Sequence, residues 1–454
     1  MKIVFFTDTF WPNVDGVAST TTQIAGELSR TGNSVWVVTL GEKEKVMQKD
    51  EINIIYLKGK KLDLYPDYKI SIFPKLKKIE KLINFNKVDI IHAQTHISMG
   101  FAAYTFSRRY NIPLVATFHT LLPDFINEVI KKKFEAIKSS KLKRILKKSK
   151  ILDLFTKFVS LMGYKWISSY YKLSDLVIVP SDFSKELLEK KGVSNITRIY
   201  NGLVNDKGET YSKLKEKYKV KKEEFILLHV GRVSYEKRID IIIKAFKIAD
   251  IQNSKLIITS KGPALDDLKN LVKKENLTDK VIFTGYVERK ELVALYDVCD
   301  IFVSPSLFEN FSVAAAEATL HGKPLICAYS GGHKEVVREG FNGFSVKHTK
   351  NEKKEIKEYA EKIKKLYNNP KLLKKMGENS KKFSNNIKFE KTFNEYLKIY
   401  KDLLKKPKQE IKQRKIKTLS EYIFLNFFLT LPGYFAKDPS KLGSKIKKIL
   451  SIKR

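Results

Sequence analysis

Two glutamates, Glu309 and Glu317, flank the predicted start of a helix. Residues 300–303 form a short apolar run closed by Ser-Pro, which is typical of the end of a buried strand. Residues 313–320 are strong helix formers, so they are predicted to form a helix directly after the loop. The two carboxylates are therefore expected one in the loop and the other about a turn into the helix.

The predicted helix start could bind an anion. Asn310 or Ser312 is available as the N-cap, and backbone N–H groups of Phe311, Ser312 and Val313 would attract a phosphate. An ionised carboxylate beside them can accept hydrogen bonds from sugar hydroxyls. Phosphate together with hydroxyls indicates a nucleotide-sugar, although a capped helix with two ordinary surface acids has the same spacing.

Three further positions could contribute to such a site. Arg232 and Lys237 lie across a loop at a predicted helix start, where two cations could clamp a diphosphate, or could simply be surface charges. His119 follows the strand predicted at residues 113–118, where ligands of open α/β sheets bind. Gly16 ends the loop after the first strand and would let the backbone pass close to a ligand, or form a plain turn.

These residues are carried by alternating strands and helices. Residues 2–6 and 34–40 are predicted as strands with a helix over 17–28 between them, which is a βαβ unit of a parallel sheet. The chain has 454 residues, more than a single core of about 250–300 residues accommodates, so two domains are expected. Only two cysteines are present, both in apolar strand-like settings, which predicts a reducing compartment.

The formal charge of +37 predicts attraction to anionic surfaces. A Lys-rich stretch followed by an apolar one (131–166) and a basic C-terminal extension with an apolar run (405–454) favour binding at a membrane surface. Helices packed on the protein are the alternative for both segments. Nucleic-acid binding is not expected, because no zinc-ligand spacing or RNA-binding signature accompanies the charge. No apolar run reaches the ~20 residues of a spanning helix, and no signal-peptide pattern begins the chain.

The motifs, taken in order, resemble the donor site of the retaining glycosyltransferases of family 4. The resemblance rests on Glu309-x7-Glu317, on His321-Gly-Lys-Pro324, on Gly331-Gly-His-Lys-Glu335 and on Gly231-Arg-Val-Ser-Tyr-Glu-Lys237. Asp15-Gly16-Val17 and Thr117-Phe-His-Thr120 resemble the family's loops in the first domain, and the resemblance ends near Leu404. Asn310 and Ser312 depart from the family, which usually has Gly at the first position and often at the second, so both are expected to crowd the loop.

The resemblance implies a role for each residue. Arg232 and Lys237 would neutralise the leaving nucleoside diphosphate without a metal, and no Asp-x-Asp metal motif is found where it would be needed. Glu317 would accept from the ribose hydroxyls, and Glu309 would hold the transferred sugar. The backbone of residues 311–313 and Gly16 would line the phosphate and sugar, while His119 would support the sugar from the other domain. His92 and His96 are expected to line the cleft at most.

The predicted fold is therefore GT-B, an α/β architecture of two facing Rossmann-like doubly wound domains with a deep cleft between them. The domains are expected at residues 1–204 on the acceptor side, carrying the 131–166 membrane-surface segment, and at 205–384 for the nucleotide-sugar. A crossover helix is expected over 385–404, followed by the 405–454 extension. Glu335 is expected to be helical and structural.

The predicted function is metal-independent transfer of a hexose from a UDP-glucose or GDP-mannose type of donor, with retention at the anomeric carbon. No cofactor is expected. A lipid acceptor is favoured, because Thr117-Phe-His-Thr-Leu121 with the basic segment after it resembles diacylglycerol glucosyltransferases and phosphatidylinositol mannosyltransferases. A soluble or polysaccharide acceptor stays open, as does a charge-driven membrane or nucleic-acid binding protein with an inactive site. The expected location is cytoplasmic, peripheral at the inner face of the cell membrane.

Overall fold

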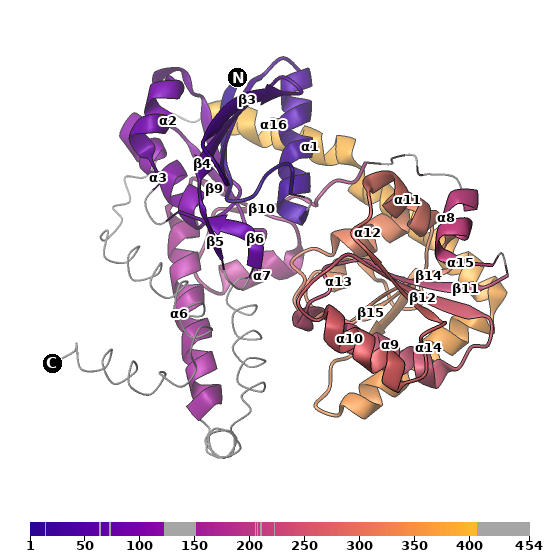
Figure 1. Cartoon of the computed structure of the whole chain (residues 1–454). Coiled ribbons are helices and arrows are strands. Elements are labelled where there is room, and N and C mark those ends of the chain that lie inside the picture. Colours follow the sequence, from indigo (N-terminus) through magenta and orange to yellow (C-terminus); the bar gives the residue numbers. More distant parts are fainter. Residues whose placement is uncertain are drawn as a thin grey trace. The chain divides into compact units, whose positions relative to one another are not determined.

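The computed structural model describes residues 1–13, 15–62, 65–71, 74–121, 151–204, 206, 208, 211–221 and 223–405. The chain divides into two compact units. Unit one comprises Met1–Val179, Lys185–Arg198 and the chain from Glu395, and unit two comprises Pro180–Ser184 and Ile199–Asn394 (Figure 1).

Unit one is built on a sheet whose described strands follow the order β10-β9-β8-β7-β1-β2-β4-β3. All neighbours are parallel except β3 and β4, which are antiparallel. The strands are β1 (Lys2–Phe6), β2 (Ser34–Gly41), β3 (Lys45–Lys49), β4 (Ile52–Lys58), β7 (Ile90–Ala93), β8 (Leu114–Thr117), β9 (Leu176–Val179) and β10 (Ile196–Arg198). A separate hairpin joins β5 (Lys60–Leu62) and β6 (Tyr65–Ile70).

The helices of unit one connect these strands as the βαβ pattern predicts. They are α1 (Gly16–Arg30), α2 (Leu76–Leu82), the 3₁₀ turn η1 (Phe85–Lys87), α3 (Ser98–Tyr110) and α6 (Ile151–Leu173). Helix α7 (Asp182–Glu189) begins within unit two and continues in unit one, as does α16 (Phe389–Lys405).

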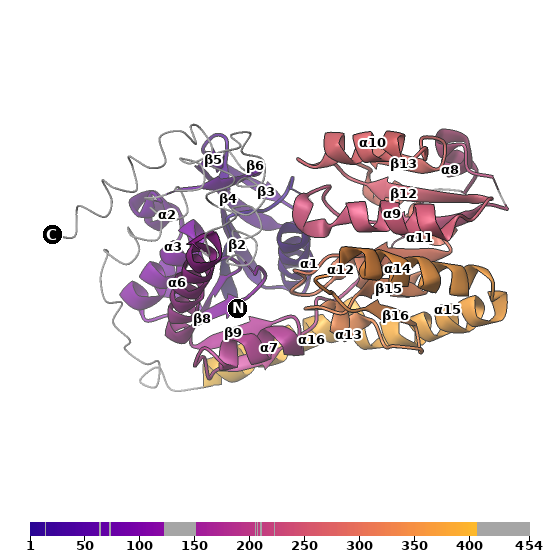
Figure 2. The same ribbon diagram turned by 90° about the horizontal axis from the view of Figure 1, so that it is seen from below.

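Unit two contains a parallel sheet in the order β13-β12-β11-β14-β15-β16, which Figure 2 shows from β13 to β16. Its strands are β11 (Phe225–His229), β12 (Ser254–Thr259), β13 (Val281–Gly285), β14 (Ile301–Ser304), β15 (Leu325–Ala328) and β16 (Gly343–Val346). Its helices are α8 (Tyr211–Tyr218), η2 (Tyr235–Lys237), α9 (Ile239–Ala249), α10 (Leu265–Lys274), α11 (Arg289–Val298), α12 (Val313–Leu320), α13 (His333–Val336), α14 (Glu352–Tyr367), α15 (Pro370–Ser384) and η3 (Asn385–Ile387).

The sheet of unit two is covered by helices on both faces (Figure 1). Along β11, Phe225 and Leu227 belong to the hydrophobic cluster that includes α9 and α14. Ile226 and Leu228 point the other way, into the cluster that includes α11 and α12. A strand buried on both faces is apolar throughout, which explains the unbroken Phe-Ile-Leu-Leu run. The doubly wound α/β architecture predicted from the sequence is confirmed.

Candidate active site

The loop between β14 and α12 carries Glu309, and α12 carries Glu317. The helix covers Val313–Leu320, as its run of strong helix formers predicts, and Ser312 occupies the N-cap position. Its side chain makes no capping hydrogen bond. Among the three predicted anion-binding N–H groups, that of Val313 already donates to the Phe311 carbonyl at 2.9 Å.

Asn310 does not act as the helix cap. Its side-chain oxygen accepts a hydrogen bond from the Ser184 hydroxyl at the start of α7, and the residue is buried. The side chain of Asn310 is thus held by Ser184, and the expectation that it crowds the donor loop stays a prediction.

Glu309 forms an ion pair with Lys237, the last residue of η2. Lys237 Nζ lies 2.6 Å from Glu309 Oε1, and the two side chains are 21% and 16% exposed. Burial alone would raise the pKa of Glu309, but the charge of Lys237, which also donates a hydrogen bond to it, holds the pKa below the usual value. Glu309 is therefore an ionised acceptor beside a cation.

The loop with Arg232 and Lys237 is fixed by two buried contacts. A Cβ at Gly262 would collide with the carbonyl of Val233, so the loop rests directly on the turn after β12. The neighbouring Arg238 makes a bidentate ion pair with Glu355 of α14, at 2.6 and 3.1 Å, and the Glu355 side chain is fully buried. Both contacts limit where the cations at residues 232 and 237 can lie.

Glu317 is already held by partners on α11. Arg289 Nη1 donates to one carboxylate oxygen and Tyr296 Oη donates to the other, at 3.2 Å. The Nε of Arg289 also donates to Asp206 at 2.8 Å. The side chain of Glu317 is 13% exposed, so it keeps a small accessible surface beside its fixed neighbours.

Two glycines bring a second loop against the Glu309 backbone. Gly332 N–H donates to the Glu309 carbonyl at 2.5 Å, and a Cβ on Gly332 would lie 2.6 Å from the Asn310 carbonyl oxygen. Gly331 has a φ of +47° and a Cβ there would collide with Glu309. The Gly-Gly pair is thus required by close packing behind the candidate site.

Two buried histidines lie beside the ion pair of Glu309 and Lys237 and were not expected from the sequence. Burial lowers the pKa values of His229 and His333 to about 4, and both rings interact electrostatically with Glu309 and Lys237. His229 Nδ1 hydrogen-bonds the Val303 carbonyl at 2.9 Å. The available signal was the position of His229 at the end of β11 and of His333 after the Gly-Gly turn.

Glu335, which follows in α13, is structural as predicted. Its Oε1 accepts from the backbone N–H groups of Asp182 and Phe183, at 2.8 and 3.2 Å, and so caps the start of α7. Its other carboxylate oxygen accepts from Tyr200 at 3.2 Å.

Gly16 and His119 belong to unit one. Gly16 is exposed and is the first residue of α1, whose N-cap Asp15 accepts from the N–H groups of Val17 and Ala18 at 3.0 Å each. Asp15 therefore occupies part of the helix end that was predicted to favour a phosphate. Buried Asp8 accepts from Met99 N–H at the start of α3, and burial raises its pKa to about 6.

His119 lies two residues beyond β8 and is half-buried. Its Nε2 is 2.6 Å from Gln94 Oε1, and burial lowers its pKa to about 4. His92 is completely buried between Tyr400 and Thr117, which is a structural role and lies within the prediction that it lines a cleft at most.

His96 is likewise buried, with Nδ1 3.2 Å from Tyr171 Oη and its ring 5.3 Å from that of Trp166. It therefore packs inside unit one, as a structural histidine does.

The segments predicted to bind a membrane lie largely outside the described residues. Residues 131–150 and 406–454 are not described, while 151–166 form the first part of α6. None of the described helices is both long enough and apolar enough to cross a bilayer. Among the described residues, no group of His, Cys, Asp and Glu side chains has the arrangement of a metal site.

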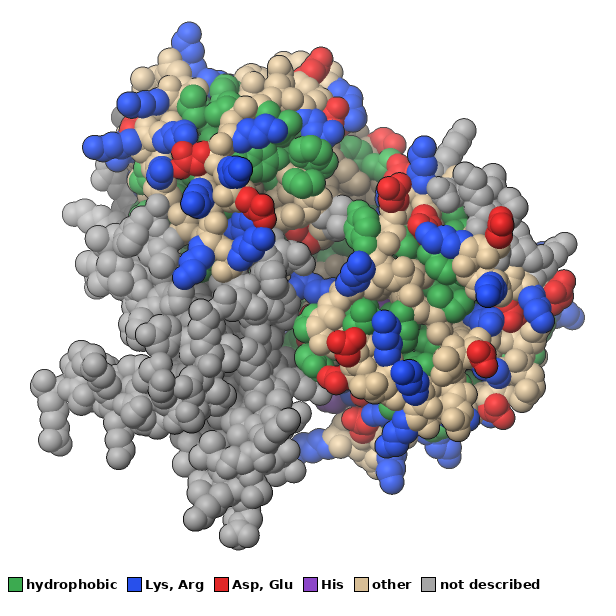
Figure 3. All heavy atoms as spheres, in the orientation of Figure 1, with side chains coloured by type: hydrophobic (Ala, Val, Ile, Leu, Met, Phe, Trp, Pro, Cys, Tyr) green, Lys and Arg blue, Asp and Glu red, His purple; other side chains and the backbone are tan. Residues whose placement is uncertain are grey.

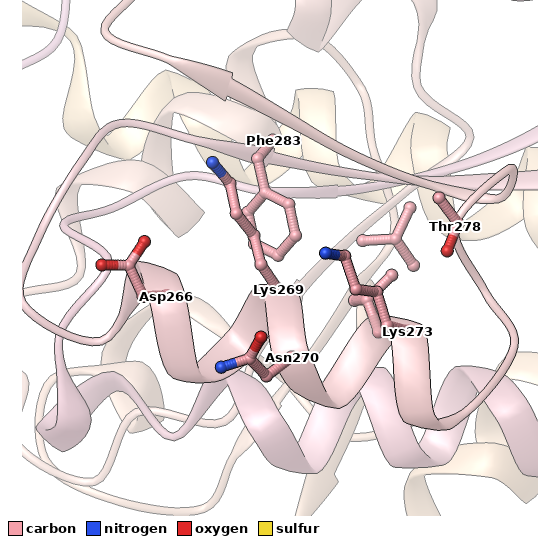
Figure 4. Close-up of a pocket in the computed structure, with 8 residues that line it drawn as sticks. Asp266, Lys269, Asn270, Lys273, Thr278 and Phe283 are labelled. Atoms are coloured by element: carbon pink, nitrogen blue, oxygen red, sulfur yellow. The ribbon is translucent and has the colours of Figure 1, made fainter.

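A separate surface pocket lies between α10 and β13. It is lined by Asp266, Lys269, Asn270, Val272, Lys273, Thr278, Val281 and Phe283 (Figure 4). It contains none of the predicted site residues. Its polar side chains are exposed groups, four of them on α10, so the candidate site remains the β14–α12 loop and the side chains around it.

Comparison with known proteins covers both units. The family model described as Glycosyltransferase Family 4 matches residues 14–207, and the one described as Glycosyl transferases group 1 matches residues 211–383. Together the two matches span most of the chain.

Curated relatives match over most of their length. α-Monoglucosyldiacylglycerol synthase of Streptococcus pneumoniae is 28% identical over 338 residues, covering 72% of this chain and 70% of the relative. The synthase of the same name from Acholeplasma laidlawii is 25% identical over 360 residues, covering 76% and 84%. A GDP-mannose-dependent α-mannosyltransferase of Corynebacterium glutamicum is 24% identical and covers 76% of each chain.

Solved structures share the fold. Anabaena HepE in complex with UDP-glucose matches with a TM-score of 0.66 and 20% identity, covering 88% of this chain and 100% of HepE. Sucrose-phosphate synthase from Thermosynechococcus elongatus matches with a TM-score of 0.63 and 19% identity, covering 88% and 98%.

Proposed function

This chain belongs to the glycosyltransferases of family 4 and has the GT-B fold, and we propose that it moves a hexose from a nucleoside-diphosphate sugar to a hydroxyl of a membrane glycerolipid. The observation that carries the donor side of this proposal is the ion pair of Lys237 and Glu309 beside the start of α12. It puts a cation for the diphosphate and an acceptor for sugar hydroxyls in direct contact.

On the donor side, Arg232 and Lys237 hold the diphosphate and stabilise the negative charge that grows on it as the glycosidic bond breaks. Lys237 has three N–H donors, so it can keep its hydrogen bond to Glu309 and bind a phosphate oxygen at the same time. Backbone groups of Phe311, Ser312 and Val313 at the helix start line the phosphate and sugar. We propose that these groups neutralise the leaving group without a metal ion.

The remaining roles concern the nucleoside and the transferred sugar. Glu317 accepts from the ribose hydroxyls, and Glu309 holds the sugar through its own acceptor oxygens. From unit one, His119 supports the transferred sugar, and the backbone at Gly16 lines its binding site. The transfer proceeds with retention at the anomeric carbon.

The proposed acceptor is the lipid diacylglycerol or a related glycerolipid. Two relatives are named monoglucosyldiacylglycerol synthases, which supports a lipid as the acceptor. The charge of +37 supports peripheral binding to an anionic membrane, which would be the inner face of the cell membrane. Lys and Arg side chains are spread over the visible face of both units among fewer acidic ones (Figure 3).

The decisive experiment measures donor hydrolysis and transfer with a panel of UDP- and GDP-sugars, with and without liposomes that contain diacylglycerol or phosphatidylinositol. Product that forms only with one lipid would identify the donor and the acceptor together. Donor turnover that does not depend on liposomes would discard the lipid acceptor and favour a soluble one. An absence of turnover with every donor would favour a binding protein.

The membrane role of the C-terminal extension needs its own test. A chain that ends at Lys405 is expected to sediment less with anionic liposomes at moderate salt while it keeps UDP or GDP binding. Undiminished sedimentation would show that residues 406–454 do not contribute to membrane binding.

A further inference from the structure

A chain of hydrogen bonds in unit one leads from His119 to helix α16. His119 Nε2 lies 2.6 Å from Gln94 Oε1, and the amide nitrogen of Gln94 lies 3.1 Å from His92 Nε2. His92 Nδ1 lies 2.6 Å from Tyr400 Oη, and His92 Nε2 lies 2.7 Å from Thr117 Oγ1. Residues from β7, β8 and α16 therefore hold one another in a buried network.

The contact between His119 and Gln94 determines which ring nitrogen of His119 carries the proton. An amide oxygen can only accept, so Nε2 must be the donor and the proton must be there. Because burial keeps the ring neutral at ordinary pH, Nδ1 is left with a lone pair and can only accept. His119 is half-buried, so the ring retains an accessible part while Nε2 is occupied.

Gln94 is itself prevented from turning over. Only 1% of its surface is exposed, and its amide nitrogen lies against a fully buried imidazole. That imidazole, His92, is fixed at both nitrogens by the hydroxyls of Tyr400 and Thr117. The amide nitrogen of Gln94 lies 3.1 and 3.3 Å from the two ring nitrogens of His92, so it faces the imidazole ring, where an N–H group is favoured over the oxygen that a flipped amide would place there.

We propose that Gln94 is a positioning residue for sugar transfer, which keeps His119 in the Nε2-protonated tautomer so that Nδ1 accepts a hydrogen bond from a hydroxyl of the transferred sugar. This inference rests on the proposed contact between His119 and the sugar. It adds that the orientation and tautomer of the ring depend on Gln94, and through His92 on Tyr400. The same geometry predicts that a sugar lacking that hydroxyl gains nothing from Gln94.

The test compares Gln94→Met, which keeps the length of the side chain but cannot accept from His119, with His119→Ala and with the double variant. We expect Gln94→Met to lower kcat by roughly tenfold, as the loss of one well-placed hydrogen bond does, and to leave KM for the donor nearly unchanged. In the His119→Ala background, Gln94→Met should have no further effect, because the group it positions is gone. Ser107→Ala is the matched control, since it removes a buried 2.7 Å hydrogen bond to Ile112 at the other end of β8.

A second measurement does not depend on activity. In protein labelled with ¹⁵N-histidine, the His119 signals, assigned by their loss in His119→Ala, should report the Nε2-protonated tautomer in the wild type and a mixture in Gln94→Met. An unchanged tautomer in Gln94→Met, or an equal loss of kcat in both backgrounds, would overturn the inference while leaving the proposed function intact. Full activity of His119→Ala would instead overturn the proposed role of His119, and the inference with it.

Discussion

Replacing Glu309 by Gln separates the two roles that we propose for its ion pair. The Gln side chain keeps nearly the same shape and an oxygen that accepts from Lys237, whose Nζ lies 2.6 Å from Glu309 Oε1. It removes the negative charge that lies beside the proposed diphosphate site. We therefore expect Glu309→Gln to bind UDP or GDP more tightly while it loses sugar transfer.

The magnitudes follow from burial of the pair. With side chains 21% and 16% exposed, the pair lies between a surface ion pair and a buried one. The attraction of Glu309 for Lys237, which competes with binding of the diphosphate, is therefore about 1 kcal/mol, or roughly fivefold in diphosphate affinity. Loss of a carboxylate that holds the sugar should lower kcat on the order of 10²–10³-fold. Lys237→Met should have the opposite effect and lower the affinity for UDP or GDP by roughly 10–100-fold, because a charge-assisted hydrogen bond is lost.

The assay is titration calorimetry with UDP and with GDP, together with the transfer assay for each variant. Glu361→Gln is the control for net charge, because Glu361 is 63% exposed in a surface pair with Lys357. The reasoning would be refuted if Glu309→Gln weakened diphosphate binding as much as Lys237→Met does, because the pair would then act as a single structural unit. Wild-type transfer by Glu309→Gln would remove the carboxylate from the reaction.

Three further predictions concern the surroundings of the site. Gly332→Ala places a Cβ 2.6 Å from the Asn310 carbonyl oxygen, so the donor loop must shift. We expect the unfolding free energy to fall by roughly 1–3 kcal/mol and UDP or GDP to bind more weakly. An unchanged unfolding free energy together with unchanged binding would contradict the close packing. Glu317→Gln should lower the affinity for UDP by about tenfold and leave the affinity for pyrophosphate unchanged. An equal loss of affinity for both ligands would argue against a ribose contact. Glu355→Gln leaves Arg238 without a counterion and should cost on the order of 3 kcal/mol in chemical unfolding at neutral pH. Burial would raise the pKa of Glu355, but Arg238 holds that pKa below the usual value. The contribution of Glu355 to stability is therefore present above about pH 4.3 and is lost on further acidification. If Glu355→Gln lowered the unfolding free energy equally down to low pH, the assignment would be refuted.

The elements of the site could be predicted from sequence because local signals determine them. Residues 313–320 form a helix in the structure as in the prediction, since the run is composed of strong helix formers. The β1 strand over residues 2–6 was also predicted at its observed bounds. The Asp15 cap of α1 could have been recognised as well, because Asp before a helix is a common N-cap.

The partners of the site residues could not be predicted, because they are distant in the sequence. Glu317 is held by Arg289 and Tyr296, which are 28 and 21 positions away. Asn310 is held by Ser184, 126 positions away, and nothing near Asn310 in the sequence indicates this partner. Such contacts depend on how strands are ordered in the sheet, which the residues themselves do not specify locally.

The two glutamates differ in how their cationic partners hold them. Arg289 uses Nε for Asp206 and Nη1 for Glu317, so its planar fork is committed to two carboxylates. It neutralises Glu317 and orients it. Lys237 is different, since an ammonium group with three rotatable donors can hold Glu309 and still bind another oxygen. We therefore propose that Lys237 keeps a donor for the leaving diphosphate while it holds Glu309, and that Arg289 positions the carboxylate proposed to bind the nucleoside.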